Sequence, residues 1–392
     1  MDALEGLQVL DLCRGYPPAF ATMFLADFGA EVIKIDPVGY INPLRPENTT
    51  DRAWAAYSFW DRKKKSIKIN FRSEKGREII HKLAKTADVF MENSRPGTMQ
   101  RLAIDYPALQ SINPRLIYCS VSGYGQNGPY RDLVGHDSNY IAVTGAMSLI
   151  GPKDGPPCMP SLLLSDIAGS SLHSLIGILL ALAARERNGK GQFVDISYTD
   201  AVFSMLGWDM ATYLLTGAPR RRGQTLQTGS EPCSAVYRTK DGEYVAIQFI
   251  EAQFWANFCR HIDRPDLIER QWPKGDEEKQ ELAAFLQELF LTRTREEWWQ
   301  WAQDKQVMLG PVRYLEEAMA DPHFKQRKMA LEIDEPGLGK IFQIGNPFKL
   351  SGTPPSLRGI SPDPGQHTEE ILKKLDYDQD QIEAMKRNGI VE

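Results

Sequence analysis

The sequence has no excess of basic residues. Its 392 residues include 46 Lys and Arg against 51 Asp and Glu, which gives a net charge of -5. Nucleic-acid binding requires an overall or strongly clustered basic surface, so this balance argues against a nucleic-acid partner. It still allows a local basic site for an anionic ligand.

Cysteine and histidine are scarce, with five and six residues. The cysteines are scattered, no CxxC pair occurs, and none has the spacing of a metal site. An odd number of cysteines, with no basic and apolar leader at the N-terminus, is typical of reduced thiols in a cytoplasmic protein. We therefore expect a cytoplasmic protein without a metal.

Long apolar runs and nucleotide signatures are also missing. The longest apolar run, residues 175–184, is shorter than the roughly 20 residues of a membrane-spanning helix, so we expect a buried helix and no membrane contact. The turn after the first predicted strand, residues 13–18, reads Cys-Arg-Gly-Tyr-Pro-Pro instead of G-x-G-x-x-G. Its prolines remove backbone donors that a pyrophosphate would use, which argues against NAD or FAD.

What the first half of the chain does contain is an alternation of strand and helix patterns. Apolar strands are predicted at residues 8–12, 31–36, 66–71, 88–92, 116–120 and 193–197, with helices at 19–28, 75–85 and 167–187. This alternation predicts an α/β fold with a parallel sheet. A looser stretch, residues 208–228, then leads to a predicted hairpin at 235–250 and to helices of a second, smaller lobe.

Asp166 stands where an apolar segment meets the long predicted helix. One interpretation is a helix cap, since Ser or Asp before an apolar helix accepts hydrogen bonds from its unpaired N–H groups. The other is a functional carboxylate at the positive end of the helix dipole, with Gly169 leaving room for a ligand. The residue pattern alone favours neither.

Two more candidates carry groups that transfer protons. His136 lies in the segment Gly-His-Asp-Ser-Asn-Tyr at 135–140, where a surface loop with an Asx turn explains the pattern equally well and where imidazole would serve as a base near neutral pH. Glu251 follows the second strand of the hairpin. A surface charge or a helix cap is the simpler interpretation for Glu251.

The basic run at residues 62–65 and a single arginine at 95 are candidate phosphate contacts. Such a run is usually a solvated face, but ammonium and guanidinium groups also suit phosphate. The candidates are Arg62, Lys63, Lys64, Lys65 and Arg95.

Over essentially its whole length the sequence resembles the class III coenzyme A-transferase family, which also contains α-methylacyl-CoA racemase. The resemblance rests on many ordered matches, at residues 7–12, 25–32, 92–97, 113–118, 122–126, 135–140, 189–192, 195–197, 310–312, 321–323 and 365–368. It implies a Rossmann-like large domain plus a smaller α+β domain, in two chains threaded through each other as an interlocked homodimer.

On this basis we expect a large CoA-binding domain at residues 1–207, a linker at 208–228, a small domain at 229–325 and a C-terminal return to the large domain at 326–392. Coenzyme A would be bound as part of an acyl-CoA substrate, without a prosthetic group. Asp137 and Tyr140 join the basic residues as expected CoA contacts. The active site would lie between the large domain of one subunit and the small domain of the other.

The resemblance implies one of two chemistries. Family transferases use the aspartate that matches Asp166 as a nucleophile, whereas the racemases use it as an acid/base opposite a histidine that matches His136 and is paired with a glutamate that matches Glu251. This chain has Tyr16 where formyl-CoA-type transferases have Gln, and residues 250–254 where they have a glycine-rich loop. We therefore predict a racemase or epimerase of a 2-methyl (α-branched) acyl-CoA, with CoA transfer between carboxylic acids as the alternative.

Overall fold

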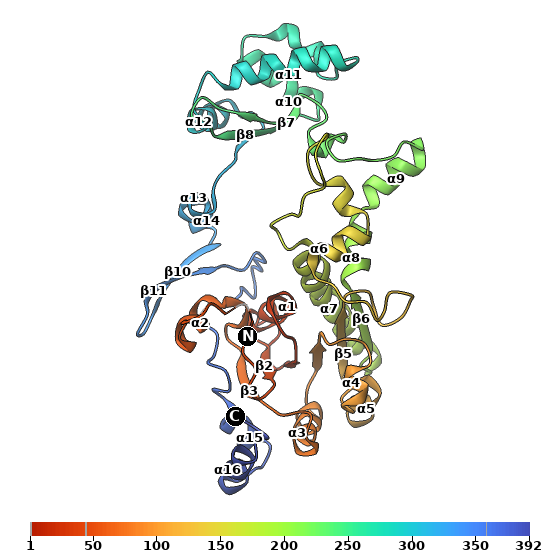
Figure 1. Cartoon of the computed structure of the whole chain (residues 1–392). Coiled ribbons are helices and arrows are strands. Elements are labelled where there is room, and N and C mark those ends of the chain that lie inside the picture. The colour runs from red at the N-terminus through yellow and green to blue at the C-terminus, as the bar shows by residue number, and fades with distance from the viewer. Residues whose placement is uncertain (1, 44, 358) are drawn as a thin grey trace. The chain divides into compact units, whose positions relative to one another are not determined.

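A parallel sheet of six strands, counted over the described residues 2–43, 45–357 and 359–392, forms the core of one of two compact units in the computed structural model (Figure 1). The strand order is β3-β2-β1-β4-β5-β6. The strands are β1 (Gln8–Asp11), β2 (Glu31–Asp36), β3 (Lys65–Lys68), β4 (Val89–Glu92), β5 (Ile117–Ser122) and β6 (Phe193–Ser197). This confirms the predicted α/β fold with a parallel sheet.

Helices cover both faces of this sheet because successive strand side chains point to opposite sides. On β1, Leu10 belongs to one buried cluster, with Ile79 of α3, while Val9 belongs to the other, with Phe24 of α1 and Ile178 of α7. The helices around the sheet are α1 (Tyr16–Asp27), α2 (Asp51–Tyr57), α3 (Glu74–Ala84), α4 (Thr98–Arg101), α5 (Tyr106–Ile112), α6 (Asp137–Val143), α7 (His173–Asn188) and α8 (Tyr198–Met205), with a 3-10 turn η1 (Phe59–Asp61).

The strand order reverses at β1, which pairs with β2 on one side and with β4 on the other. In open α/β sheets the connections that follow the two strands at such a point run to opposite faces of the sheet. A crevice therefore opens beyond the carboxyl ends of these strands. The turns after β1 and β4 therefore adjoin a position where ligands commonly bind.

The long predicted helix is interrupted in its geometry. A π-helical stretch, η3 (Leu164–Leu172), precedes α7, and Gly189 ends α7 in the left-handed conformation with φ 73°. Leu164–Asn188 is long and apolar enough to cross a membrane, and 39% of its most apolar window is buried. Core helices of proteins that never enter a membrane pass the same test of length and hydropathy.

The C-terminal residues 320–392 pack with the same unit as the parallel sheet. They contain α14 (Pro322–Gln326), the antiparallel pair β10 (Ala330–Glu335) and β11 (Gly339–Ile344), α15 (Thr368–Lys374) and α16 (Gln379–Arg387). Ile371 and Ile382 enter the core beside β1, and Val391 bridges to Ile69. The tail thus completes one face of the sheet.

A second unit consists of Gly145–Pro160 and Gly207–Met319. It has a three-stranded antiparallel sheet, counted over its described residues, in the order β7 (Ser234–Arg238), β8 (Tyr244–Gln248) and β9 (Leu309–Pro311). Its other elements are η2 (Ala146–Leu149), α9 (Gly207–Thr216), η4 (Leu226–Thr228), α10 (Ala252–His261), η5 (Pro265–Arg270), α11 (Asp276–Phe290), α12 (Arg295–Lys305) and α13 (Leu315–Ala320). Trp255 and Trp298 fill its core. The stretch expected to be a linker, 208–228, holds most of α9 and all of η4.

Candidate active site

His136 and Asp166 come from two elements that pack together beyond the sheet. His136 is the N-cap residue of α6, and Asp166 lies in the first turn of η3. His136 is exposed and Asp166 is partly buried. Asp137, the residue after His136, accepts from the N–H of Asp166 at 3.0 Å, so the structure brings the two predicted residues into one region.

Asp137 fixes the position of Asp166. Its Oδ1 accepts hydrogen bonds from the N–H of Ser165 at 2.7 Å, from Ser165 Oγ at 2.8 Å and from the N–H of Asp166 at 3.0 Å. Asp137 is 8% exposed. A carboxylate with these three donors is held inside the chain, which does not support the expected contact between Asp137 and CoA; we assign it to positioning.

The carboxyl group of Asp166 is poised for proton transfer. Burial, with a smaller contribution from the negative charge of Asp137, raises the pKa of Asp166 to about 6, and His136 opposes the rise. A general acid or base works best when its pKa lies near the operating pH. The local environment therefore suits Asp166 to take up and release a proton near neutrality.

Two tyrosines lie near this carboxyl group. Tyr140 and Tyr198 have ring centres 4.9 Å apart, and the charge of Asp166 adds to the burial that raises the pKa of each phenol. The hydroxyl of Tyr140 donates to the carbonyl oxygen of Gly135 at 2.5 Å. Tyr140 thus braces the residue before His136, and its hydroxyl is already engaged, which does not support the expected contact with CoA.

The basic run is mostly turned into the protein. The guanidinium of Arg62, 0% exposed, donates to both carboxylate oxygens of Asp27, at 2.9 and 2.6 Å. Lys64 Nζ lies 2.9 Å from Asp11 Oδ2 and 2.8 Å from Asp61 Oδ1. Arg62 and Lys64 are buried and paired with carboxylates, so the structure does not support the expectation that they contact a phosphate.

The other two members of the run face outward. Lys63 is partly buried in a left-handed conformation with φ 61°, and burial lowers the pKa of its ammonium group. Lys65 is paired with Glu31 and Glu370, at 2.6 and 2.7 Å. Neither lines the arginine-rich cavity that the structure reveals nearby.

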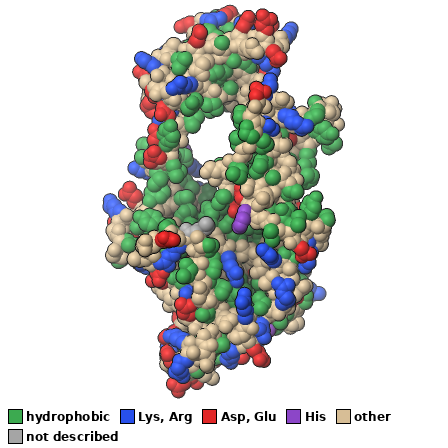
Figure 2. All heavy atoms as spheres, viewed as in Figure 1, with side chains coloured by type: hydrophobic (Ala, Val, Ile, Leu, Met, Phe, Trp, Pro, Cys, Tyr) green, Lys and Arg blue, Asp and Glu red, His purple; other side chains and the backbone are tan. Residues whose placement is uncertain are grey.

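That cavity, of about 470 Å³, lies at the turns after β1, β3 and β4. Four arginines line it, and within the described part of the chain none of them pairs with a carboxylate: Arg14, Arg72, Arg95 and Arg101. We call this group the arginine cluster. Figure 2 shows Lys and Arg side chains gathered on this face near α4. The cluster includes the predicted Arg95, and its other members were not predicted.

Asn93 ties two of these turns together. Its Oδ1 accepts from the N–H of Arg14 at 2.9 Å, and its Nδ2 donates to the carbonyl oxygen of Arg14 at 3.0 Å. The backbone of Arg14 is therefore tied to the turn after β4, which carries Arg95, at the reversal point where the strand order predicts a crevice.

Glu251 belongs to the second unit. It is exposed and is the N-cap residue of α10, directly after β8, and its side chain makes no capping hydrogen bond. Over the ranges that the structure describes, no group of three or more His, Cys, Asp or Glu side chains has the arrangement of a metal site.

Comparison with known proteins places the chain in a family. Residues 4–368 match the model of CoA-transferase family III. Human succinyl-CoA:glutarate CoA-transferase is 33% identical over 404 residues, covering 99% of this chain and 90% of that protein. Human alpha-methylacyl-CoA racemase is also 33% identical, covering 100% and 98%.

The fold is shared as well. The crystal structure of a CAIB/BAIF family protein from Brucella suis superimposes with a TM-score of 0.79 at 29% identity, covering 96% of this chain and all of that one. The chain belongs to CoA-transferase family III, and it is an enzyme of the group that includes both CoA-transferases and acyl-CoA racemases. Its relatives act on CoA substrates.

Proposed function

We propose that the protein racemises or epimerises a 2-methyl or otherwise α-branched acyl-CoA by removing and returning the α-proton. The observation that carries this proposal is the partly buried Asp166, with a pKa raised to about 6, next to His136. A transferase needs a nucleophilic carboxylate, whereas inversion needs two groups that exchange protons, and a carboxyl group with a raised pKa near an imidazole meets the second requirement.

The thioester makes the α-proton acidic enough for a side-chain base. One of the two groups, Asp166 or His136, takes the proton, and the C–H electron pair moves into the thioester to form an enolate. The protonated form of the other group returns a proton to the opposite face of the α-carbon. Glu251 from a partner subunit would pair with His136 and hold its ring. The active site would then lie between the large domain of one subunit and the small domain of the other.

We propose that the arginine cluster binds the phosphates of CoA. Four guanidinium groups without carboxylate partners suit the pyrophosphate and 3′-phosphate through paired N–H donors. Arg95 remains from the original set, and Arg14, Arg72 and Arg101 replace Arg62, Lys63, Lys64 and Lys65. Arg101→Glu should weaken CoA binding and make it less dependent on salt concentration. Lys63→Glu reverses a charge outside the cavity and is the matched control, for which CoA binding should stay the same.

The decisive experiment incubates one enantiomer of a 2-methylacyl-CoA with the enzyme in deuterated water and no free acid. Deuterium at the α-carbon with loss of optical purity supports the racemase. His136→Ala should slow both by roughly 10²–10⁴-fold, while CoA binding stays nearly unchanged. If nothing happens until a carboxylic acid is added, and CoA then moves to that acid, the enzyme is a transferase with Asp166 as nucleophile.

A further inference from the structure

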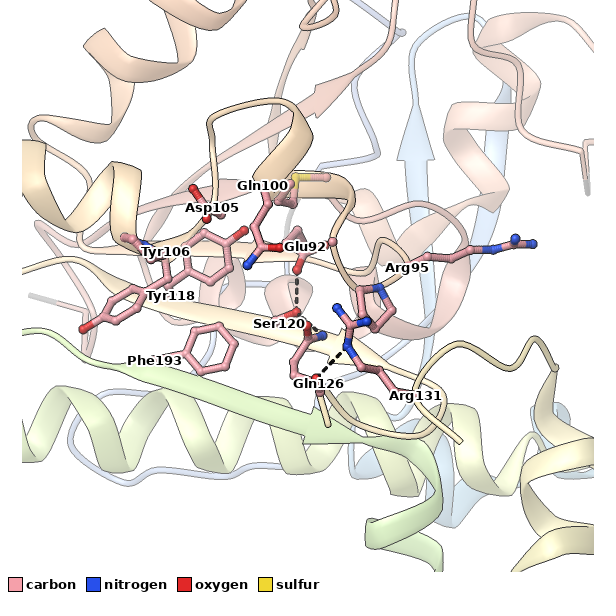
Figure 3. A pocket seen from close by; sticks show the side chains of 14 residues that line it. Glu92, Arg95, Gln100, Asp105, Tyr106, Tyr118, Ser120, Gln126, Arg131 and Phe193 are labelled. Atoms are coloured by element: carbon pink, nitrogen blue, oxygen red, sulfur yellow. Dashed lines mark hydrogen bonds between the residues drawn. The ribbon is translucent and has the colours of Figure 1, made fainter. Parts of the chain in front are cut away.

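Glu92 is a buried carboxyl group that the proposed proton transfer does not use. It ends β4, is 3% exposed, and lines a cavity of about 270 Å³ formed by residues of β4, β5, β6, α4, α5 and the loop after β5 (Figure 3). A buried carboxyl group is costly unless it is hydrogen-bonded, so its partners indicate what it holds in place.

Those partners point in two directions. Glu92 Oε2 accepts from the N–H of Ser94 at 2.6 Å, in the turn that carries Arg95. Glu92 Oε1 accepts from Ser120 Oγ at 2.5 Å, and Ser120 Oγ accepts in turn from Gln126 Nε2 at 2.9 Å. Figure 3 shows this series of contacts from Glu92 through Ser120 to Gln126.

The Gln126 end leads toward the catalytic histidine. Its carbonyl oxygen accepts from Arg131 Nε at 2.9 Å and its N–H donates to Asp195 Oδ2 at 3.1 Å. A few residues further along, this loop reaches His136, the cap of α6. The turn after β4 and the loop that carries Arg131 also lie close together. A Cβ added at Gly97 in that turn would be 3.6 Å from Arg101 Nη1 and 3.7 Å from Arg131 Nη2.

We propose that Glu92 is a positioning residue that holds the turn of the arginine cluster and the loop before His136 in one arrangement, so that its protonation state changes the affinity for CoA. This inference rests on the proposed function in one respect, namely that the arginine cluster binds CoA. Glu92 itself touches neither CoA nor the reacting atoms.

The charges around Glu92 set the direction of the effect. Burial raises the pKa of Glu92 to about 7, hydrogen bonds from Ser120 and Ser94 oppose the rise, and Asp195 on β6 adds to it. Other titratable or charged groups on the elements packed around it include the thiols of Cys13 and Cys119, the phenols of Tyr106 and Tyr118, and the carboxylates of Asp11 and Asp105. The nearby cations are Arg95, Arg101 and Arg131.

An ionised Glu92 places a poorly screened negative charge behind the arginine cluster. Bound CoA brings further negative charge to the same turn, so CoA binds better when Glu92 is uncharged. Affinity for CoA should therefore fall as the pH rises through about 7. A repulsion over roughly 10 Å at an intermediate dielectric corresponds to an about three- to tenfold change in affinity.

The test is calorimetric titration of free CoA into the wild type and Glu92→Gln from pH 5.5 to 8.5. Gln mimics the uncharged carboxyl group, so the variant and the wild type should bind CoA equally well at low pH. At pH 8.5 the variant should bind CoA about three- to tenfold more tightly than the wild type. Comparing the two proteins at each pH cancels the titration of the CoA phosphates. Tyr106→Phe, which changes another residue of the same cavity, should follow the wild type.

Kinetics of α-proton exchange separate positioning from general damage. Glu92→Gln should change the pH dependence of KM and leave kcat within about threefold, because Glu92 does not reach the reacting atoms. Ser120→Ala cuts the link to Gln126 and should lower kcat more than it changes KM. If Glu92→Gln does not fold, Glu92→Asp keeps the charge at a shorter reach and should shift the midpoint of the wild-type pH dependence.

Identical pH profiles of CoA affinity for the wild type and the folded variant would overturn the role of Glu92. Failure of the wild type to bind CoA at any pH would instead overturn the proposed function. The two failures are thus told apart by a single set of titrations.

Discussion

At the scale of single residues, the burial that raises the pKa of Asp166 also opposes folding. Its pKa is about 6 in the folded chain and near 3.8 when exposed. Between these values the folded state binds more protons than the unfolded state, so this carboxyl group lowers the stability progressively as the pH rises from about 4 to 6, and fully above 6.

Asp166→Asn should therefore stabilise the protein at pH 8 while it abolishes exchange. Because Asp166 is partly exposed, we reduce the full linkage value for solvent screening and expect about 1 kcal/mol. At pH 3 the difference should nearly vanish, since the wild-type group is then mostly protonated in both states. Urea unfolding at the two pH values measures it; an equal gain at both would mean that the charge of Asp166 is not the cause.

Asp137 offers a second test at this scale. Asp137→Asn keeps an oxygen that accepts the Ser165 and Asp166 donors but removes the negative charge that helps to raise the pKa of Asp166. The acidic limb of the pH–rate profile for exchange should move to lower pH. Asp137→Ala should instead cost about 2–4 kcal/mol of stability, because buried donors lose their acceptor. An unmoved acidic limb in a folded Asp137→Asn enzyme contradicts the assignment.

Some of these residues were accessible from the sequence and others were not. His136 was singled out by the ordered motif at 135–140 and Asp166 by its place at the start of the long predicted helix. The structure packs α6 and η3, which carry them, against each other, and their catalytic roles stay predictions. The burial of Arg62 and Lys64 could not be predicted, because successive side chains of an extended segment alternate sides. The sequence alone does not say which side meets Asp27 and Asp11. The arginine cluster draws on several separate turns, so no local pattern marks it.

At the scale of secondary structure, glycines mark where elements approach each other closely. Gly191 lies just before β6, where an added Cβ would be 2.0 Å from the carbonyl oxygen of Leu116, and its N–H donates to Pro114 at 2.9 Å. The strand β6 can pair with β5 only if this position has no side chain.

Gly191→Ala should therefore destabilise the protein by about 3 kcal/mol or more, because the backbone must move away. Gly207→Ala is the matched control: nothing lies within 4 Å of its added Cβ, and the change should stay within about 0.5–1 kcal/mol. The midpoints of urea unfolding compare the two. Equal midpoints would show that the contact at Leu116 relaxes freely.

The predicted elements also show where sequence patterns fail. The strands β2 and β6 match their predicted ranges, Glu31–Asp36 and Phe193–Ser197. Glycines precede both of them, at Gly29 and Gly191. The long helix was predicted from residue 167, but its first turns are the π-helical η3, which begins at Leu164. An apolar sequence is compatible with both an α-helix and the wider π-helix. The π-helical form of η3 depends on its packing against α1, α6 and α8, which are distant in the sequence.

At the scale of the whole molecule, the single chain leaves large apolar side chains exposed. On α7, Ile176 is 53% and Leu180 is 66% exposed, and on α9 of the second unit Leu214 and Leu215 are 79% and 86% exposed. Apolar surface of this extent usually marks an interface. We propose that a second copy of the chain covers it, as the expected interlocked homodimer requires.

A dimer with shared sites makes a quantitative prediction for mixed chains. If each site joins Asp166 of one chain to Glu251 of the other, a heterodimer of Asp166→Ala and Glu251→Ala chains contains one site with both lesions and one intact site. Purified heterodimers should then regain about half of the wild-type exchange activity, while each homodimer stays inactive. Glu269→Ala, at another exposed glutamate of the second unit, should remain fully active alone and supplies the control for surface changes.

The two chains are co-expressed with different tags and isolated by both, so that no wild-type chain contributes. Recovery near half requires the site to be built across the subunits, whereas heterodimers as inactive as the parents would mean that each chain builds its site alone.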